Sequence, residues 1–250
     1  MCLAAFSLQA SAEYSLVFAA NRDELHERPT TPAGWWDESR AILGGRDLVA
    51  GGSWLAVDRS GRLAAVTNFR EISDTVYSVS RGRLVQDYLG SSVGAEEYLA
   101  GLDAHAADYG PFNLVIFDGQ RLHYASNRAP GQELDPGVYA LSNTHLGSTW
   151  PKVTHAEARL TACLDSGDLS ACLFDLLADR TLHGEWLDSD DREFRLKSTI
   201  FLQDDHYGTR ASTVVLLSRN GELRFIERRF DADGMLVGES SESFVTRTST

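Results

Sequence analysis

The feature that most constrains the fold is a repeated pairing of short apolar runs. In four places two such runs are separated by only a few polar or turn-forming residues, and strands joined in this way lie antiparallel as hairpins. The strongest of these turns contains Asn220-Gly221, a pair typical of two-residue hairpin loops. The predicted hairpins pair Cys2–Gln9 with Tyr14–Ala20, Trp54–Val57 with Leu63–Phe69, Asn113–Phe117 with Leu122–Ala125, and Ser212–Leu217 with Leu223–Arg229.

Helical patterns lie between these hairpins. Apolar residues recur at helical spacing within Gly94–Tyr109, from Val153 to Cys163, and over Leu169–Leu177. Hairpins with helices grouped between them predict an α+β fold, in which antiparallel sheets are covered by helices on an outer face. No repeat or linker divides the chain, so we expect a single domain over residues 1–250, with the polar stretch Thr181–Arg195 as a surface excursion.

Charge and cysteine content limit the kinds of binding partner and the cellular compartment that fit this chain. The net charge of −13 repels phosphate backbones, which argues against a nucleic-acid partner. The sequence has neither a signal-peptide pattern nor an apolar run long enough for a membrane span, so we expect a cytoplasmic protein. Its three cysteines have no disulfide-framework or zinc spacing, and we interpret Cys163 and Cys172 as core residues with reduced thiols.

Cys2 has a chemical option that no internal cysteine has. Initiator methionine is normally removed when a small residue follows it, and removal here would leave a thiol and a free α-amine on one carbon. An α-amine titrates near pH 8 and a thiol near 8.5, so the two groups can exchange a proton close to neutral pH. A nucleophile with its own base is one interpretation, and a small core residue is the other.

Four polar residues follow the second predicted strand, where the sequence reads NRDE. One interpretation is a solvated strand end in which Arg22 pairs with Asp23 or Glu24. The other is a pocket wall facing Cys2 on the adjacent strand, in which Arg22 or Asp23 sets the ionisation of the thiol. Because consecutive side chains alternate between faces, only two of the four can share the face of the thiol.

Other candidate site residues also lie at the ends of apolar runs. Asn68 and Asn143 each end such a run, either as turn residues or as two amides that donate to one oxyanion. Arg210 precedes the apolar strand at Ser212, as a surface charge or a site residue. The seven histidines lack metal-ligand spacing, which argues against a His-ligated metal, and His145 is of interest only because it lies beside Asn143.

Taken in order, these motifs resemble the NRDE-motif family, the transport and Golgi organisation protein two homologues. The resemblance rests on MC at the start, NRDE at 21–24, RPT at 28–30, LGGRDLVAGGSWLAV at 43–57, VTNFRE at 66–71, LSNTHL at 141–146 and YGTRASTVVLL at 207–217. This family in turn resembles N-terminal nucleophile hydrolases with an N-terminal cysteine, such as bile salt hydrolase and penicillin V acylase. The resemblance implies their four-layer αββα sandwich, with helices outside and two antiparallel sheets inside.

The resemblance also implies an activity and a set of catalytic residues. Trimmed Cys2 would attack a non-peptide amide or (thio)ester bond and form an acyl-enzyme, with its own α-amine as base. Asp23 would hold the α-amine, Asn68 and Asn143 the oxyanion, and Arg210 would lie near the thiol. The acylases place their Arg and Asp three residues apart, whereas Arg22 and Asp23 are adjacent here. The hydrolase needs no cofactor or metal, and its partner would be a small acyl substrate.

A different class of function fits the same family. Its members are also implicated in handling haem or acyl-CoA-type lipids, which would make the site a carrier pocket. Cys2 or His145 could then be an axial haem ligand. Arg22, Arg28 and Arg46 could bind the phosphates of a nucleotide-bearing lipid, with Asn21 and Glu24 also lining the pocket. A purely structural or trafficking protein is a third and weaker alternative.

Overall fold

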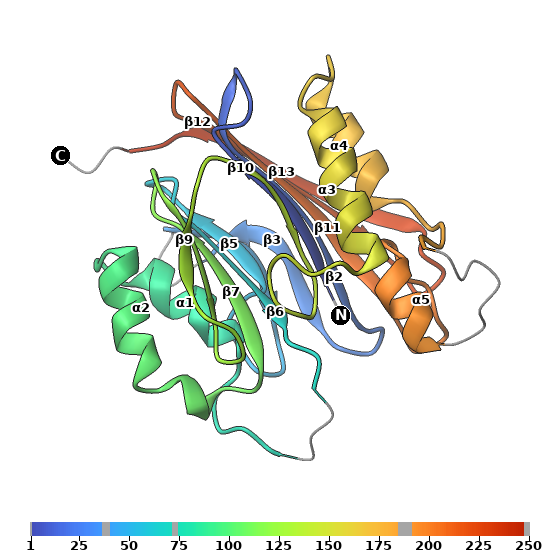
Figure 1. Cartoon of the computed structure of the whole chain (residues 1–250), viewed down its shortest axis with the longest axis horizontal. Coiled ribbons are helices and arrows are strands. Elements are labelled where there is room, and N and C mark those ends of the chain that lie inside the picture. Colours follow the sequence, from blue (N-terminus) through green and yellow to red (C-terminus); the bar gives the residue numbers. More distant parts are fainter. Residues whose placement is uncertain (1, 37–40, 72–74, 185–191, 248–250) are drawn as a thin grey trace.

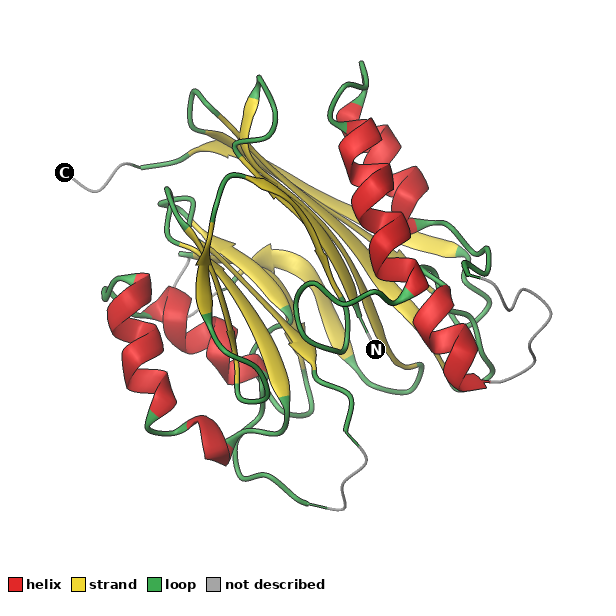
Figure 2. Ribbon diagram, viewed as in Figure 1, coloured by secondary structure: helices red, strands yellow, loops and turns green. Residues whose placement is uncertain are grey.

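A computed structural model describes residues 2–36, 41–71, 75–184 and 192–247. Two antiparallel sheets face each other (Figures 1 and 2). The six-stranded sheet has the order β10 (Gly137–Leu141), β1 (Leu3–Leu8), β2 (Tyr14–Leu25), β11 (Tyr207–Ser218), β12 (Glu222–Phe230), β13 (Leu236–Val245). The seven-stranded sheet has the order β3 (Thr30–Trp35), β4 (Ile42–Asp47), β5 (Leu55–Asp58), β6 (Leu63–Asn68), β7 (Phe112–Phe117), β8 (Leu122–Ser126), β9 (Gln132–Leu134).

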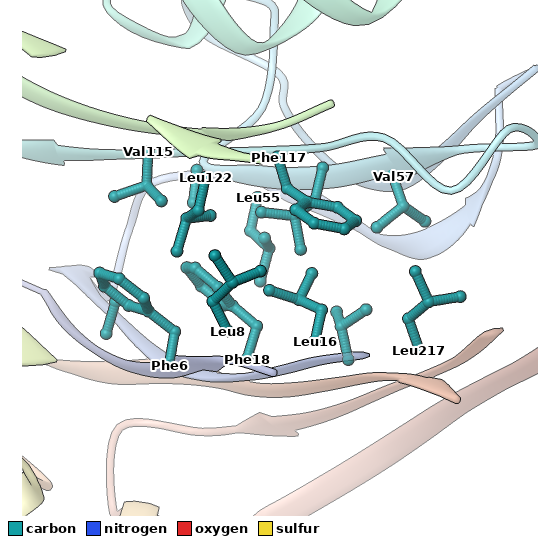
Figure 3. Packing of buried hydrophobic residues seen from close by; sticks show 14 of the residues in the cluster. Phe6, Leu8, Leu16, Phe18, Leu55, Val57, Val115, Phe117, Leu122 and Leu217 are labelled. Atoms are coloured by element: carbon teal, nitrogen blue, oxygen red, sulfur yellow. The ribbon is translucent and has the colours of Figure 1, made fainter. Parts of the chain in front are cut away.

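The largest apolar cluster fills the space between the two sheets (Figure 3). Even-numbered residues of β1 and β2 point into it, and the rings of Phe6 and Phe18 stack there with centroids 5.3 Å apart. Leu55 and Phe117 face them from the other sheet. Burying such side chains from both sheets in one cluster holds the sheets together.

Helices cover the outer face of each sheet (Figure 2). Odd-numbered residues of β1 and β2 point to this side of the six-stranded sheet and pack against α3 and α4. The opposite sheet packs in the same way against α1 and α2. The helices are α1 (Gly82–Gly90), α2 (Ala95–Asp103), a 3-10 turn (Ala106–Asp108), α3 (Pro151–Cys163), α4 (Leu169–Leu177) and α5 (Arg192–Ser198). None of the described helices is long and apolar enough to cross a membrane.

The four predicted hairpins are confirmed as β1–β2, β5–β6, β7–β8 and β11–β12. The predicted end of the second strand is wrong. β2 continues past Ala20 to Leu25, because β11 pairs with it along its whole length, from Leu217 opposite Leu16 to Tyr207 opposite Leu25. The four polar residues of NRDE therefore lie inside a strand and not beyond its end. Of the expected excursion over Thr181–Arg195, residues 185–191 lie outside the described residues, and α5 begins at Arg192.

The expectation of reduced thiols at Cys163 and Cys172 is wrong, because the two form a disulfide. Cys163 ends α3 and Cys172 lies in α4, so the bond links the two helices that cover the six-stranded sheet. Both residues belong to or pack against the apolar cluster there, as their helical spacing predicts. Disulfides are rare in cytosolic proteins, so the cytoplasmic location stays a prediction.

Loss of this bond should destabilise the fold measurably. We expect Cys172→Ser to lower the free energy of unfolding by about 2–3 kcal/mol, because a cross-link closing a loop this short restricts the unfolded chain by about that much. Urea denaturation checks this result. Wild-type protein kept under reductant is the matched control and should unfold at the same midpoint as the variant. Equal midpoints for the variant and oxidised wild type would contradict the prediction.

Candidate active site

Strand register brings Cys2 between two of the predicted site residues. Leu3 pairs with Asn21 of β2, and Ala4 pairs with Leu141 of β10. Continuing both ladders to the head of β1 sets Cys2 opposite Arg22 on one side and opposite Asn143 on the other. The fold thus assembles this group at the N-terminal end of β1 from the β1–β2 hairpin and from the end of β10, which is distant in sequence (Figure 1).

Asn143 connects Cys2 to the neighbouring sheet. The side chain of Asn143 is buried, and its Oδ1 accepts a hydrogen bond from the backbone nitrogen of Cys2 at 3.0 Å. Its Nδ2 donates to the carbonyl oxygen of Asn68 at 2.6 Å. Ser142 adds a second hold on Cys2, since its hydroxyl donates to the Cys2 carbonyl at 2.8 Å. Asn143 therefore fixes the backbone nitrogen of Cys2, the atom that removal of Met1 would convert to an α-amine.

The two predicted oxyanion amides occupy different environments. The Asn68 side chain is exposed, and Asn68 joins the network through its main-chain carbonyl. The Asn143 amide nitrogen already donates to that carbonyl. For Asn143 to hold an oxyanion, its amide must exchange the Asn68 carbonyl for the substrate oxygen.

Asp23 and Arg22 lie on opposite faces of β2, as alternation requires. Asp23 is buried on the helix-covered side, where Thr209 of β11 donates its hydroxyl to Oδ1 at 2.7 Å. Burial raises the pKa of the Asp23 carboxyl, and the positive charges of Lys152 and Arg22 oppose that rise. Arg22 is on the inter-sheet side, the side that Cys2 takes by register.

The thiol of Cys2 is held near neutral pH in its protonated form. Burial raises its pKa, and the negative charge of Asp23 raises it further. A hydrogen bond from the Asp23 main-chain N–H and the charge of Arg22 act in the opposite direction. Because the thiol is not ionised in advance, nucleophilic attack by Cys2 requires a base.

Arg22 is 5% exposed and is fixed by several partners. Its guanidinium lies over the Trp54 ring, 4.5 Å from the centroid. It also pairs with Glu24 at 3.7 Å and Asp47 at 3.8 Å, and Arg28 binds the same Asp47 at 2.6 Å. Each of the two interpretations of NRDE therefore holds in part. Arg22 pairs with the partly exposed Glu24, as in the first, and it is itself buried on the inter-sheet side, as in the second.

Arg210 lies at a break in the ladder between β2 and β11. Thr209 pairs with Asp23 and Ala211 pairs with Arg22, so Arg210 is the extra residue of a bulge. A bulge changes the direction in which a side chain points, and bulges are common next to functional sites. Arg210 Nη1 donates to the carbonyl of Leu25 at 2.9 Å, and Arg210 and Arg22 line one small cavity.

The remaining predicted ligand-binding residues do not gather around Cys2. Asn21 is buried but structural, because its amide donates to the carbonyls of Leu177 and Ile200. Arg46 lies over the Trp36 ring and lines a separate cavity beside α1. His145 is exposed, and its Nδ1 lies 3.3 Å from the hydroxyl of Thr144.

Sequence reasoning missed two cations of this site, Lys152 and Arg81. Lys152, at the start of α3, is completely buried, and it interacts electrostatically with Asp23 and Cys2. Arg81 interacts with Cys2 and donates to the Pro111 carbonyl at 3.2 Å. One signal was available for Lys152: the chain has only two lysines among its 23 Lys and Arg residues, at positions 152 and 197.

A small cavity of about 170 Å³ adjoins the buried guanidinium of Arg22, and Arg210, Trp54, Thr30, Thr31 and Glu227 also line it. That volume is below the 300–1,000 Å³ usual for pockets that hold drug-sized ligands. A larger cavity of about 740 Å³ lies between α5 and the ends of β11 and β12, and Cys2 does not line it.

Glu227 in this cavity wall predicts a pH dependence of stability. The carboxyl is 1% exposed, its Oε1 accepts from the Ala33 N–H at 2.8 Å, and burial raises its pKa despite Arg229 at 3.6 Å. The folded protein therefore binds this proton more tightly than the unfolded chain. Its stabilising contribution is present below the unfolded-state pKa and is lost as pH rises through the folded-state pKa.

We therefore expect the unfolding free energy of wild type, relative to that of Glu227→Gln, to fall as pH rises. The total fall should be about 1.4 kcal/mol for each unit by which the folded-state pKa of Glu227 exceeds its unfolded-state pKa. The Gln variant keeps the oxygen that accepts from Ala33 but cannot ionise. Urea denaturation at a series of pH values measures the difference. A constant difference across the series would refute the assignment.

Among the described residues, one group of three side chains is close enough to hold a metal ion: His155, Asp179 and His183. Both His Nε2 atoms approach Asp179 Oδ2, at 3.3 and 3.0 Å. The two imidazole rings, however, stack with centroids 3.6 Å apart and an interplanar angle of 17°. Lone pairs that lie in nearly parallel ring planes do not converge on one ion, so this arrangement does not fit a metal as it stands.

The fold is similar to that of a known class among solved structures, the N-terminal nucleophile hydrolases. The structure of a Caenorhabditis elegans N-acylethanolamine-hydrolyzing acid amidase ortholog matches with a TM-score of 0.50 at 9% identity, over 86% of this chain and 92% of that one. A Clostridium perfringens conjugated bile acid hydrolase, in its C2A mutant form, gives a TM-score of 0.49 at 11% identity, over 99% and 98%. At such identities the likeness concerns the fold alone.

The chain belongs to the Transport and Golgi organisation 2 family, whose model matches residues 1–232. The Transport and Golgi organization protein 2 homolog of Bos taurus is 31% identical, and the match covers 86% of each chain. The Drosophila melanogaster Transport and Golgi organization protein 2 is 28% identical, and the match covers 91% of each chain. The family expected from the motifs is confirmed.

Proposed function

We propose that this protein is an N-terminal cysteine hydrolase with a four-layer αββα sandwich. It would cleave a non-peptide amide or (thio)ester bond of a small molecule through an acyl-enzyme on Cys2. The observation that carries the proposal is the hold on the Cys2 backbone nitrogen by buried Asn143, in a site that also contains the buried carboxyl of Asp23. The helix–sheet–sheet–helix order supports the sandwich.

Removal of Met1 turns the Cys2 nitrogen into a primary amine. The thiol and the base that accepts its proton then belong to the same residue. As the sulfur attacks the substrate carbonyl, the thiol proton passes to the α-amine and a C–S bond forms. The ammonium then returns the proton to the leaving group as its bond to carbon breaks. Water hydrolyses the resulting thioester, with the same amine as base. The raised pKa of the thiol makes this internal base necessary.

Asn143 and Asp23 have separate tasks in this scheme. Asn143 Oδ1 orients the amine toward the sulfur of its own residue. The Asp23 carboxylate stabilises the ammonium that forms during attack, and its hydrogen bond from Thr209 fixes its position. Asn143 Nδ2 and Asn68 would serve the oxyanion once the substrate oxygen replaces the Asn68 carbonyl as acceptor.

Two observations favour the second candidate, a non-catalytic carrier of haem or acyl-CoA-type lipid. The Asn143 amide already has an acceptor, and the thiol pKa is raised and not lowered. The geometry of the proposed ligands gives it less support. Exposed His145 does not line the cavity beside Arg22, and Arg46 lies apart from Arg22 and Arg28.

The two candidates separate in one set of assays on the purified protein. The hydrolase is supported if the protein turns over members of a panel of acyl amides, esters and thioesters. It should then also give no Soret band after haem addition and retain no acyl-CoA through gel filtration. A Soret band or retained acyl-CoA without turnover of any panel member contradicts the hydrolase and supports the carrier.

A further inference from the structure

Lys152 is a buried charge near Cys2 that the proposed mechanism leaves unused. Its side chain is 0% exposed, and its Nζ has no hydrogen-bond partner among the described residues. An ammonium group in this position gives up its hydration without replacement, which destabilises a folded protein. A lysine retained there at a cost in stability suggests a task in the site.

The position of Lys152 is set by the first turn of α3. Pro151 begins the helix, and α3 packs on β1, the strand that Cys2 directly precedes, and on the neighbouring β10. Asp23 points to the same helix-covered side from β2. Lys152 thus lies on the helix-covered face of the six-stranded sheet, whereas Arg22 and its cavity lie on the inter-sheet face.

The charges around Lys152 come from several elements. The pKa of Lys152 is lowered, mainly by burial and also by the charge of Arg70, while the charges of Asp23 and Cys2 oppose that fall. Lys152 in turn lowers the pKa of Asp23. The other cations that interact with Cys2 are Arg22 and Arg81. Arg22 shares ion pairs with Glu24 and Asp47, so much of its charge is already balanced.

We propose that Lys152 is a positioning residue, whose ammonium is the countercharge that keeps Asp23 a carboxylate and favours the Cys2 thiolate during attack. This inference rests on the proposed function, because it assigns Lys152 to the same nucleophile. A purely structural lysine would leave the chemistry of Cys2 unchanged when replaced.

The rate of Cys2 alkylation by iodoacetamide, measured against pH and assigned to Cys2 by peptide mass, tests the proposal without any substrate. In Lys152→Met we expect the profile to move to higher pH, with a rate at neutral pH about tenfold lower, the change that one unit of pKa gives. Lys152→Arg keeps the charge and should stay close to wild type. Lys197→Met removes the other lysine, which lies over Trp150, and should leave the profile unchanged.

Urea denaturation of the same variants separates chemistry from folding. Lys152→Met also takes the countercharge from buried Asp23, so we expect it to be less stable than wild type, and alkylation is compared where urea denaturation shows the variants to be folded. Lys152→Gln is the second neutral variant if the Met variant does not fold. A folded neutral variant with the wild-type alkylation profile would overturn the proposal. So would an equal shift in Lys197→Met.

Failure of this inference differs from failure of the proposed function. If the panel shows no turnover but the alkylation profile still shifts, Lys152 tunes Cys2 and the hydrolase assignment is the one that falls. If turnover occurs and the profile does not shift, the hydrolase stands and Lys152 has no such task.

Discussion

Replacement of Cys2 by Ala is expected to reduce turnover by a factor on the order of 10⁶, as removal of a catalytic nucleophile does in other hydrolases. The variant has an α-amine in the same place but no sulfur to form the acyl-enzyme. It should therefore gain no acyl group from an electrophilic acyl probe. Steady-state turnover on the best panel substrate and intact mass after probe treatment measure the two effects.

The matched control for this variant is Cys172→Ser, which removes a sulfur from the disulfide between α3 and α4 and leaves Cys2 in place. It should keep the turnover of wild type at a temperature where it stays folded. Wild-type turnover in Cys2→Ala would exclude Cys2 as the nucleophile and leave the fold as a ligand-binding shell.

Replacement of Asn143 by Ala should have the second largest effect, a fall in turnover of about a hundredfold or more. This side chain is the described link between the Cys2 nitrogen and the Asn68 carbonyl, at 3.0 and 2.6 Å. Its loss frees the base to move, and a displacement of about 1 Å costs a factor of this size. The effect should appear in kcat more than in KM, because Asn143 contacts the nucleophile residue.

Asn127→Ala provides the control for losing a bridging amide. Asn127 also joins two segments, since it accepts from the Phe112 N–H at 3.0 Å and donates to the Ala106 carbonyl at 3.0 Å, but in the other sheet. It should lose stability comparable to Asn143→Ala and keep its kcat. Equal kcat values in the two variants would show that Asn143 is only structural.

The sequence predicted those strand pairs in which both strands are evident as apolar runs. The strands β3, β4, β9, β10 and β13 were not predicted, although β3 and β4 also pair with each other. β4 contains Gly44 and Gly45, which suggest a turn. In the structure a Cβ on Gly44 would lie 2.7 Å from the Leu55 carbonyl, so these glycines serve close strand packing. β13 has mostly exposed or half-exposed residues at the sheet edge and so lacks an apolar signal.

The site was predicted in part, and the reasons differ by residue. Cys2 and Asn143 were selected because each adjoins an apolar run. These two runs pair as β1 and β10, and their register brings the two residues together. The faces of Arg22 and Asp23 were left open, because they depend on β2 continuing through NRDE to pair with β11. Lys152 was missed because its burial is set by the packing of α3, which no local pattern encodes.

Intact mass spectrometry of the purified protein, before and after an electrophilic acyl probe, tests the central claim most directly. The account predicts a chain that lacks its initiator methionine and that gains one acyl group, located on Cys2. A chain that retains Met1 and stays unmodified by the probe would contradict it, because Cys2 would then have neither a free amine nor a reactive sulfur.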